Sequence, residues 1–185
     1  MKTVLKKQKL LQAASLQHGL VWILAQAVLL LWTASCSQAV HLEKTILINA
    51  PVSRVYDYIN QIRNGKEWDP WSAADPTMQT NYGPIDSGVG ASYSWTSENS
   101  GSGKAVITSA IVNERIETAL DFGKMGSATA SMQLKAEAGQ TRLTWGFDSE
   151  VPIFFVSKVK TDVGQNYEQG LANLKKILES SAPGH

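Results

Sequence analysis

The sequence predicts an α+β domain: a curved antiparallel sheet that packs against one long C-terminal helix, preceded by an apolar N-terminal helix. Between residues 40 and 147, apolar and polar residues alternate in six segments, the pattern of strands with one buried face. From residue 156 onwards, apolar residues recur at helical spacing. Because consecutive short strands with one polar face are typical of an antiparallel meander, we expect no parallel βαβ units.

The first strand is expected from Val40 to Asn49, where only Leu47 breaks the alternation. Ala50-Pro51 then opens a short helix, because the proline ring already has the backbone angle of a first helical residue. The buried stripe of this helix should consist of Val52, Val55, Tyr56 and Ile59.

Five further strands are expected, joined by turns at Gly101–Gly103 and Ala138–Gln140. Their inward-facing residues would be Val89, Ala91, Tyr93 and Trp95; Ala105, Ile107 and Ile111; Ile116, Leu120 and Phe122; Ala128, Ala130, Met132 and Leu134; and Leu143, Trp145 and Phe147. The stripe of the final helix would consist of Val156, Val159, Val163, Tyr167, Leu171, Leu174 and Leu178.

The charges divide the chain into two parts, residues 1–39 and 40–185. Of the 17 basic and 16 acidic residues, only four lysines precede Glu43, so the remainder has 13 basic and 16 acidic groups. A net charge of −3 without a basic cluster excludes nucleic acid as the expected partner.

Residues 1–39 predict a signal anchor. Gly19 to Ser35 is an apolar stretch of 17 residues, at the lower limit for crossing a bilayer. The preceding lysines would hold the N-terminus in the cytoplasm and place the domain on the extracytoplasmic face of the membrane. The alternative is a signal peptide cleaved at Ser37-Gln-Ala39, which would give a secreted or periplasmic protein. Thr33-Ala-Ser-Cys36 also resembles a lipoprotein cleavage box.

Histidine and cysteine are missing from the interior of residues 40–185. Cys36 and His18 lie in the leader, His41 at the junction and His185 at the end. This excludes Cys/His and Ser/His nucleophilic sites and nearly all zinc sites, since each needs an imidazole or thiolate on a fixed scaffold. We therefore expect no metal and no cofactor.

Several strings resemble the SRPBCC superfamily, specifically its polyketide cyclase/dehydrase and lipid transport-like branch, related to START domains. They are Ile46-Leu-Ile-Asn-Ala-Pro51, Tyr58-Ile-Asn60, Trp68-Asp-Pro-Trp71-Ser72, Gly88-Val-Gly90-Ala91, Asn113-Glu-Arg115-Ile116 and Tyr167-Glu-Gln-Gly170-Leu-Ala-Asn-Leu174-Lys175. The resemblance covers about residues 42 to 180 and implies the helix-grip fold, in which seven strands wrap the C-terminal helix around a hydrophobic cavity. A short connection between Phe147 and Tyr167 would trim the mouth of that cavity.

The candidate ligand-binding residues are mainly aromatic. They are Trp68, Trp71, Tyr93, Trp95, Leu120, Phe122, Met132, Trp145, Phe147, Phe154, Phe155, Val163 and Tyr167. The alternative is that these side chains only fill the core, as aromatic residues often do. Gly164 and Gly170 in the final helix would permit close packing or leave space.

Trp68 to Pro76 is the densest local motif. Its two prolines and two aspartates disfavour regular helix. Trp68 and Trp71 would either form a lip over the cavity or anchor a loop to the core.

The predicted function is binding or transport of a small lipid-like or polycyclic ligand at a membrane surface. One alternative is a cyclase or dehydratase in which the hydroxyls of Tyr93 and Tyr167 polarise a carbonyl. Another is a protein-interaction module similar to the co-chaperone members of the superfamily. Since the sequence places no carboxylate pair on the inner face, we expect binding rather than catalysis.

Overall fold

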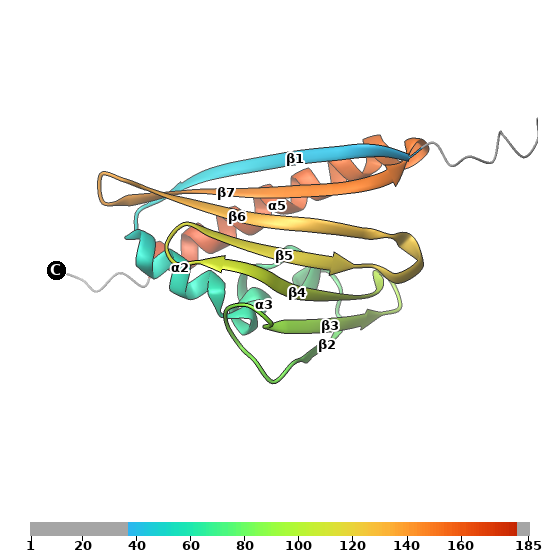
Figure 1. Ribbon diagram of the computed structural model, residues 1–185, viewed down its shortest axis with the longest axis horizontal. Helices are drawn as coiled ribbons and strands as arrows, with labels where there is room; N and C mark the ends of the chain where they lie inside the picture. Colours follow the sequence, from blue (N-terminus) through green and yellow to red (C-terminus); the bar gives the residue numbers. More distant parts are fainter. Residues whose placement is uncertain (1–36, 181–185) are drawn as a thin grey trace, which may run out of the picture. The chain divides into compact units, whose positions relative to one another are not determined.

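The computed structural model describes residues 37–180, and this part of the chain forms one curved sheet with a long helix across its concave face (Figure 1). The sheet contains β1 (Ser37–Ile48), β2 (Gln79–Tyr82), β3 (Ser92–Ser97), β4 (Gly101–Ile111), β5 (Arg115–Asp121), β6 (Ser127–Glu137) and β7 (Gln140–Pro152). Its seven strands are antiparallel in the order β1-β7-β6-β5-β4-β3-β2. The α+β helix-grip prediction is confirmed.

The helices close one side of the sheet. They are α2 (Val52–Asn60), α3 (Gly65–Trp68), α4 (Pro70–Ala74) and α5 (Val156–Ser180), with single 3₁₀ turns η1 (Ile62–Asn64), η2 (Gly123–Met125) and η3 (Ile153–Phe155). α5 buries Tyr167, Leu171, Leu174 and Leu178 of the predicted stripe. Since α5 is amphipathic, it packs against the sheet with one face and leaves the other in solvent.

β1 forms the outer edge of the sheet, although it comes first in the chain. It pairs with β7 along its full length, from Ser37 opposite Pro152 to Ile48 opposite Thr141. The buried residues Val40 and Ile48 lie on its inner face, as the alternation predicts. The first strand therefore begins at the end of the sheet where β7 finishes and α5 starts (Figure 1).

Three local predictions are wrong. Ile111, expected to face inwards, is 43% exposed because the register shift between Ile107 and Ser109 reverses the alternation of β4. Gly101–Gly103 belongs to β4, and the chain turns one step earlier, between Ser97 and Gly101. Gly103 allows close strand packing rather than a turn, because a Cβ there would lie 2.3 Å from the ring of Trp95 on the facing strand. Val89 is also not an inward strand residue, since it lies in the turn before β3 and is 62% exposed.

The motif from Trp68 to Pro76 is more helical than predicted, because its polar residues cap a helix. The Asp69 carboxylate accepts hydrogen bonds from the backbone N–H groups of Trp71 and Ser72, at 3.0 and 3.4 Å. Pro70 occupies the first position of α4, where a missing N–H costs nothing. Asp69 and Pro70 thus start a helix rather than prevent one.

The predicted leader lies outside the described residues, apart from residues 37–39, which form the start of β1. The signal anchor, the cleaved signal peptide and Cys36 lipidation stay predictions. Within residues 37–180, no helix is long and apolar enough to cross a membrane.

Candidate functional site

The concave face of the sheet, α5 and the α3–α4 segment enclose a cavity of about 470 Å³. Most of its wall is apolar or aromatic, and it extends over most of the sheet. Eleven of the thirteen predicted residues line it: Trp68, Trp71, Tyr93, Trp95, Leu120, Phe122, Met132, Trp145, Phe147, Val163 and Tyr167. Strand parity accounts for the six that lie within strands, Tyr93, Trp95, Leu120, Met132, Trp145 and Phe147, because adjacent side chains on a strand point to opposite faces.

Phe154 and Phe155 do not line the cavity. They lie on η3, between the end of β7 and the start of α5, and are 91% and 56% exposed. Strand parity no longer applies there, since the backbone turns at Pro152 into a 3₁₀ helix. Their assignment to the inner wall is therefore wrong.

One wall of the cavity is a packed aromatic cluster. The rings of Trp145 and Tyr167 stack with centroids 3.7 Å apart and an interplanar angle of 8°. Trp68 meets Trp145 edge-on at 5.1 Å, and Trp71 meets it at 6.2 Å. The Asn173 side chain on α5 donates a hydrogen bond to the Trp68 carbonyl at 3.2 Å, which fastens α3 to the helix. Trp68 is buried and forms part of the wall rather than a free lip. Trp71 is only half-buried.

The opposite wall carries a second aromatic run across β2, β3 and the end of β5. Centroids of neighbouring rings lie 6.1 Å apart for Tyr82 and Tyr93, and 5.9 Å apart for both Tyr93–Trp95 and Trp95–Phe122. These four rings are only partly buried, although the last three belong to the predicted inner face. Their free faces form part of the surface that a ligand would contact.

Three tyrosines line the cavity, Tyr82, Tyr93 and Tyr167, and the hydroxyls of the last two are the predicted polar groups. Tyr167 donates a long hydrogen bond of 3.5 Å to the Gly146 carbonyl. The Tyr93 hydroxyl makes no hydrogen bond to any other residue within 37–180. Burial is the main cause that raises the pKa of both Tyr93 and Tyr167 well above the ordinary value of 10.0. Both groups are therefore neutral near pH 7, and the Tyr93 hydroxyl is free to bond to a ligand.

Charged groups reach the cavity only through the α3–α4 segment. Among residues 37–180, Lys66 and Asp69 are the two that line it, and sequence reasoning missed both. Lys66 is exposed, and Asp69 is engaged as the cap of α4. The spacing of Asp69 before Pro70 is a helix-start signal that could have indicated this arrangement.

A buried carboxylate fastens the rim of the cavity. Asp75 is 5% exposed and accepts hydrogen bonds from the hydroxyls of Thr77, Ser97 and Ser100, at 2.6 Å for Thr77 and Ser100. These bonds hold the pKa of Asp75 well below its usual range, with Ser100 as the largest cause. Because Ser100 lines the cavity and Asp75 follows α4, the network ties the α4–β2 connection to the β3–β4 hairpin.

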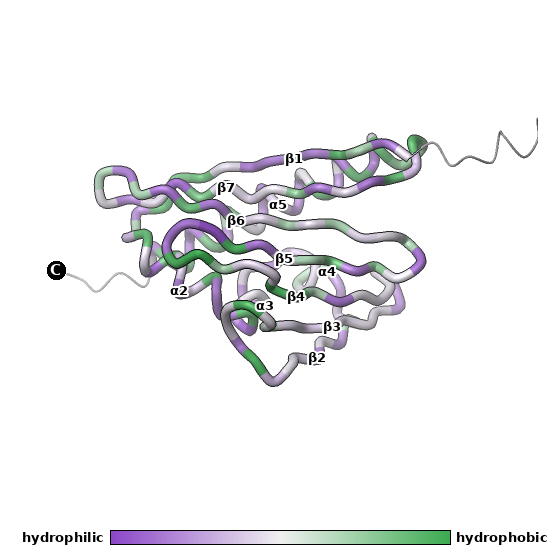
Figure 2. The backbone as a smooth tube through the Cα atoms, in the orientation of Figure 1, coloured by the Kyte–Doolittle hydropathy of each residue, from purple (hydrophilic) through white to green (hydrophobic). Residues whose placement is uncertain are grey.

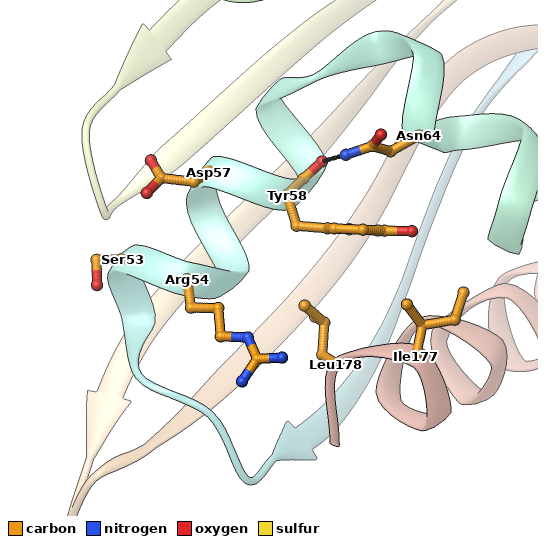
Figure 3. A pocket seen from close by; sticks show the side chains of 7 residues that line it. All are labelled: Ser53, Arg54, Asp57, Tyr58, Asn64, Ile177 and Leu178. Atoms are coloured by element: carbon orange, nitrogen blue, oxygen red, sulfur yellow. Dashed lines mark hydrogen bonds between the residues drawn. The ribbon is translucent and has the colours of Figure 1, made fainter. Parts of the chain in front are cut away.

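A second depression, of about 580 Å³, lies between α2 and the end of α5 (Figure 3). It is lined by Ser53, Arg54, Asp57, Tyr58, Asn64, Ile177 and Leu178. In Figure 3 the Tyr58 ring lies above α5, and Asn64 donates a hydrogen bond of 3.0 Å to the Tyr58 carbonyl. This depression shares no lining residue with the cavity between the sheet and α5.

No group of three or more His, Cys, Asp or Glu residues able to hold a metal ion is found among residues 37–180. The single histidine of this range, His41, lies on the outer face of β1. Its Nδ1 is 2.7 Å from the Asp148 carboxylate on β7.

Solved structures of the same fold match most of the chain. A Staphylococcus aureus protein of unknown function is 12% identical, with a TM-score of 0.63 over 79% of this chain and 97% of that one. The di-domain ARO/CYC StfQ of the steffimycin biosynthetic pathway is 12% identical, with a TM-score of 0.60 over 78% of this chain and 52% of that one.

Truncated norcoclaurine synthase from Thalictrum flavum is also 12% identical, with a TM-score of 0.59 over 76% of this chain and 94% of that one. These likenesses show the fold alone. No curated protein matches the chain. A family model described as polyketide cyclase / dehydrase and lipid transport matches residues 39–179, and the chain therefore belongs to that family, within the SRPBCC superfamily.

Proposed function

We propose that this protein binds and carries one small hydrophobic molecule in the cavity between the sheet and α5. The family and fold support a hydrophobic ligand-binding domain. The observation that carries the proposal is a cavity of about 470 Å³ whose walls are mostly apolar and aromatic. Cavities of roughly 300 to 1,000 Å³ with few polar groups are typical of small-molecule sites.

The polar groups of the cavity narrow the ligand class. A ligand charge would lose its hydration against the aromatic walls, at a cost of several kcal/mol or more. A neutral molecule with a carbonyl or hydroxyl oxygen would instead accept a hydrogen bond from Tyr93, whose hydroxyl has no other partner within residues 37–180. We therefore expect a lipid-like or polycyclic ligand with one such oxygen.

A membrane location is part of the proposal. Residues 1–39, with four lysines and then 17 mostly apolar residues, would tether the domain to the extracytoplasmic face of a bilayer. The carrier would then exchange its ligand with that bilayer.

Cavity filling tests ligand binding directly. Ala130 lies on the inner face of β6 and lines the cavity, whereas Ala119 is exposed on the outer face of β5. Ala130→Leu should reduce affinity for a neutral naphthylamine dye about tenfold or more, equivalent to about 1.4 kcal/mol, because the added carbons occupy the binding volume. Ala119→Leu adds the same carbons outside and should leave the affinity unchanged.

The dye titration is paired with native mass spectrometry of the mildly purified full chain. A retained apolar ligand and displacement of the dye by fatty acids, sterols or aromatic polyketides would support the proposal. Equal dye binding by both leucine variants would contradict it, as would an empty cavity that no apolar compound fills. An empty cavity together with a stable protein partner would favour the interaction-module alternative.

A second candidate function rests on the same free hydroxyl. Tyr93 could donate a hydrogen bond to a ketone oxygen and stabilise the enolate formed during a cyclisation or dehydration. Turnover of a poly-β-ketone by the wild-type chain, lost in Tyr93→Phe, would establish this function. Binding of the same compound without turnover would leave the carrier function in place.

A further inference from the structure

Three consecutive large hydrophobic residues project into solvent at one end of the sheet. Ile153, Phe154 and Phe155 form η3 and are 49%, 91% and 56% exposed. Figure 2 shows hydrophobic colouring where β7 passes into α5. Soluble proteins rarely expose contiguous apolar patches, and those that they do expose are commonly interaction sites.

The cavity extends to the same end. Strand register places Ala128, at the start of β6, opposite Ser149 near the end of β7, so the β5–β6 connection lies at this end. That connection carries Met125, which is 70% exposed and also lines the cavity. Val151 and Val159, on either side of η3, line the cavity as well. We call Ile153, Phe154, Phe155 and Met125 together the hydrophobic end.

The chain enters the domain at the hydrophobic end. Ser37 begins β1 and pairs with Pro152, the residue immediately before η3. In the sequence, the apolar stretch from Gly19 to Ser35 stops two residues before Ser37. The chain therefore connects residues 19–35, through Cys36, to the strand end that pairs with Pro152.

The hydrophobic end carries charges of both signs, with the acidic Asp121 and Glu150 near the ends of β5 and β7 and lysines on the adjoining turns. Lys124 on η2 and Lys160 in the first turns of α5 are exposed and make no ion pair with any residue of 37–180. Lys158 is paired with Asp162, and Glu150 accepts a hydrogen bond from Ser37 at 3.2 Å. Free lysines beside aromatic residues are the usual composition of a protein surface that lies on a bilayer.

We propose that the hydrophobic end is a lipid-docking surface: Phe154 and Phe155 insert into the bilayer interface, and the cavity exchanges its ligand with the membrane past Met125. This proposal rests on the proposed carrier function, for which it names the surface and the source of the ligand. A Cβ on Gly101 would lie 3.5 Å from the end of the Met125 side chain, so Met125 reaches the start of β4 at this rim. Its flexible side chain can move aside for a ligand.

Site-specific fluorescence on the full chain tests the docking surface. In a Cys36→Ser background, Phe154→Cys carries a polarity-sensitive nitrobenzoxadiazole label. Val112→Cys carries the same label as the matched control, because Val112 is 67% exposed in the β4–β5 turn at the opposite end of the sheet. Both proteins are reconstituted into vesicles of phosphatidylcholine and phosphatidylglycerol with nitroxide groups on the upper acyl chain.

The label at 154 should shift to shorter wavelength and be quenched by the nitroxide lipids, while the label at 112 should do neither. Equal signals at both positions, or no quenching at 154, would overturn the proposal. A shift at 154 that grows with protein concentration without vesicles would also overturn it, because a second copy would then cover the surface.

A transfer assay separates this proposal from the carrier function. Phe154→Ser/Phe155→Ser should bind the neutral dye in solution with unchanged affinity but extract it from vesicles about tenfold more slowly, because both inserting rings are lost. If the wild-type chain binds no dye while the 154 label inserts, the carrier function fails and the docking surface stands. If dye binding and extraction are both normal in the double variant, the docking surface fails and the carrier function stands.

Discussion

Two glycines on the buried side of α5 provide a matched test of how closely the helix approaches the sheet. At Gly164, a Cβ would lie 3.6 Å from Lys44 Cε and 3.8 Å from Leu42 Cδ2, which are ordinary van der Waals distances. Alanine in a helix is more favourable than glycine by about 1 kcal/mol. Gly164→Ala should therefore raise the free energy of unfolding by about 1 kcal/mol.

Gly170 should behave in the opposite way. A Cβ there would lie 2.9 Å from Trp145 Cζ3 and 3.3 Å from Pro70 Cδ, so one of these rigid rings or the helix itself must move. Overpacking of this kind costs about 1 to 3 kcal/mol. After the gain of about 1 kcal/mol in helix propensity, Gly170→Ala should lower the free energy of unfolding by about 1 kcal/mol.

Thermal unfolding of the two full-length variants, followed by near-ultraviolet circular dichroism, measures the difference. For a domain of this size, 1 kcal/mol corresponds to a shift of about 3 °C, upward for Gly164→Ala and downward for Gly170→Ala. Because Trp145 lines the cavity, Gly170→Ala should also weaken dye binding, and Gly164→Ala should not. Equal shifts of the same sign would refute the reasoning, since helix propensity alone would then explain both.

Three further predictions concern polar groups. Tyr93→Phe should lower affinity for a carbonyl-bearing ligand about fivefold, the value of one hydrogen bond, and leave affinity for a pure hydrocarbon unchanged; equal losses in calorimetric titrations would contradict this. Because hydrogen bonds lower the pKa of Asp75, its ionised carboxylate stabilises the folded state at pH values above the ordinary pKa of 3.8. This stabilisation is lost as pH falls through the folded-state pKa, and the acid unfolding of Asp75→Asn should lack that pH dependence. The Asp148 hydrogen bond raises the pKa of His41 above 6.5, so its stabilisation is present below that pH and disappears as pH rises through the folded-state value. NMR titration should show a lower His41 pKa in Asp148→Asn, and an unchanged pKa would contradict the pairing.

Strand parity accounts for most of what could be predicted about the cavity. Alternation orients Tyr93, Trp95, Leu120 and Phe122 correctly, because each strand has one buried and one wet face. It does not detect β2, whose residues Gln79–Tyr82 include no aliphatic side chain and depend on pairing with β3.

Residues outside the strands were harder to place. Met125 and Phe154 lie on 3₁₀ turns, where two-residue periodicity carries no information about direction. The Asp75 carboxylate accepts hydrogen bonds from three hydroxyl groups, one in the next loop and two in the β3–β4 hairpin. Such a network depends on tertiary position, which a single sequence does not encode.

The pairing of the first strand with the last has a consequence for folding kinetics. β1 cannot form its hydrogen bonds until β7 has been synthesised, because Ser37 pairs with Pro152 and β1 has no other strand neighbour among residues 37–180. Contacts between distant parts of a chain form slowly, since loop closure must precede them. During synthesis β1 therefore stays unpaired until β7 has been made. The cavity is complete only after α5, which follows β7 in the chain, has also been synthesised.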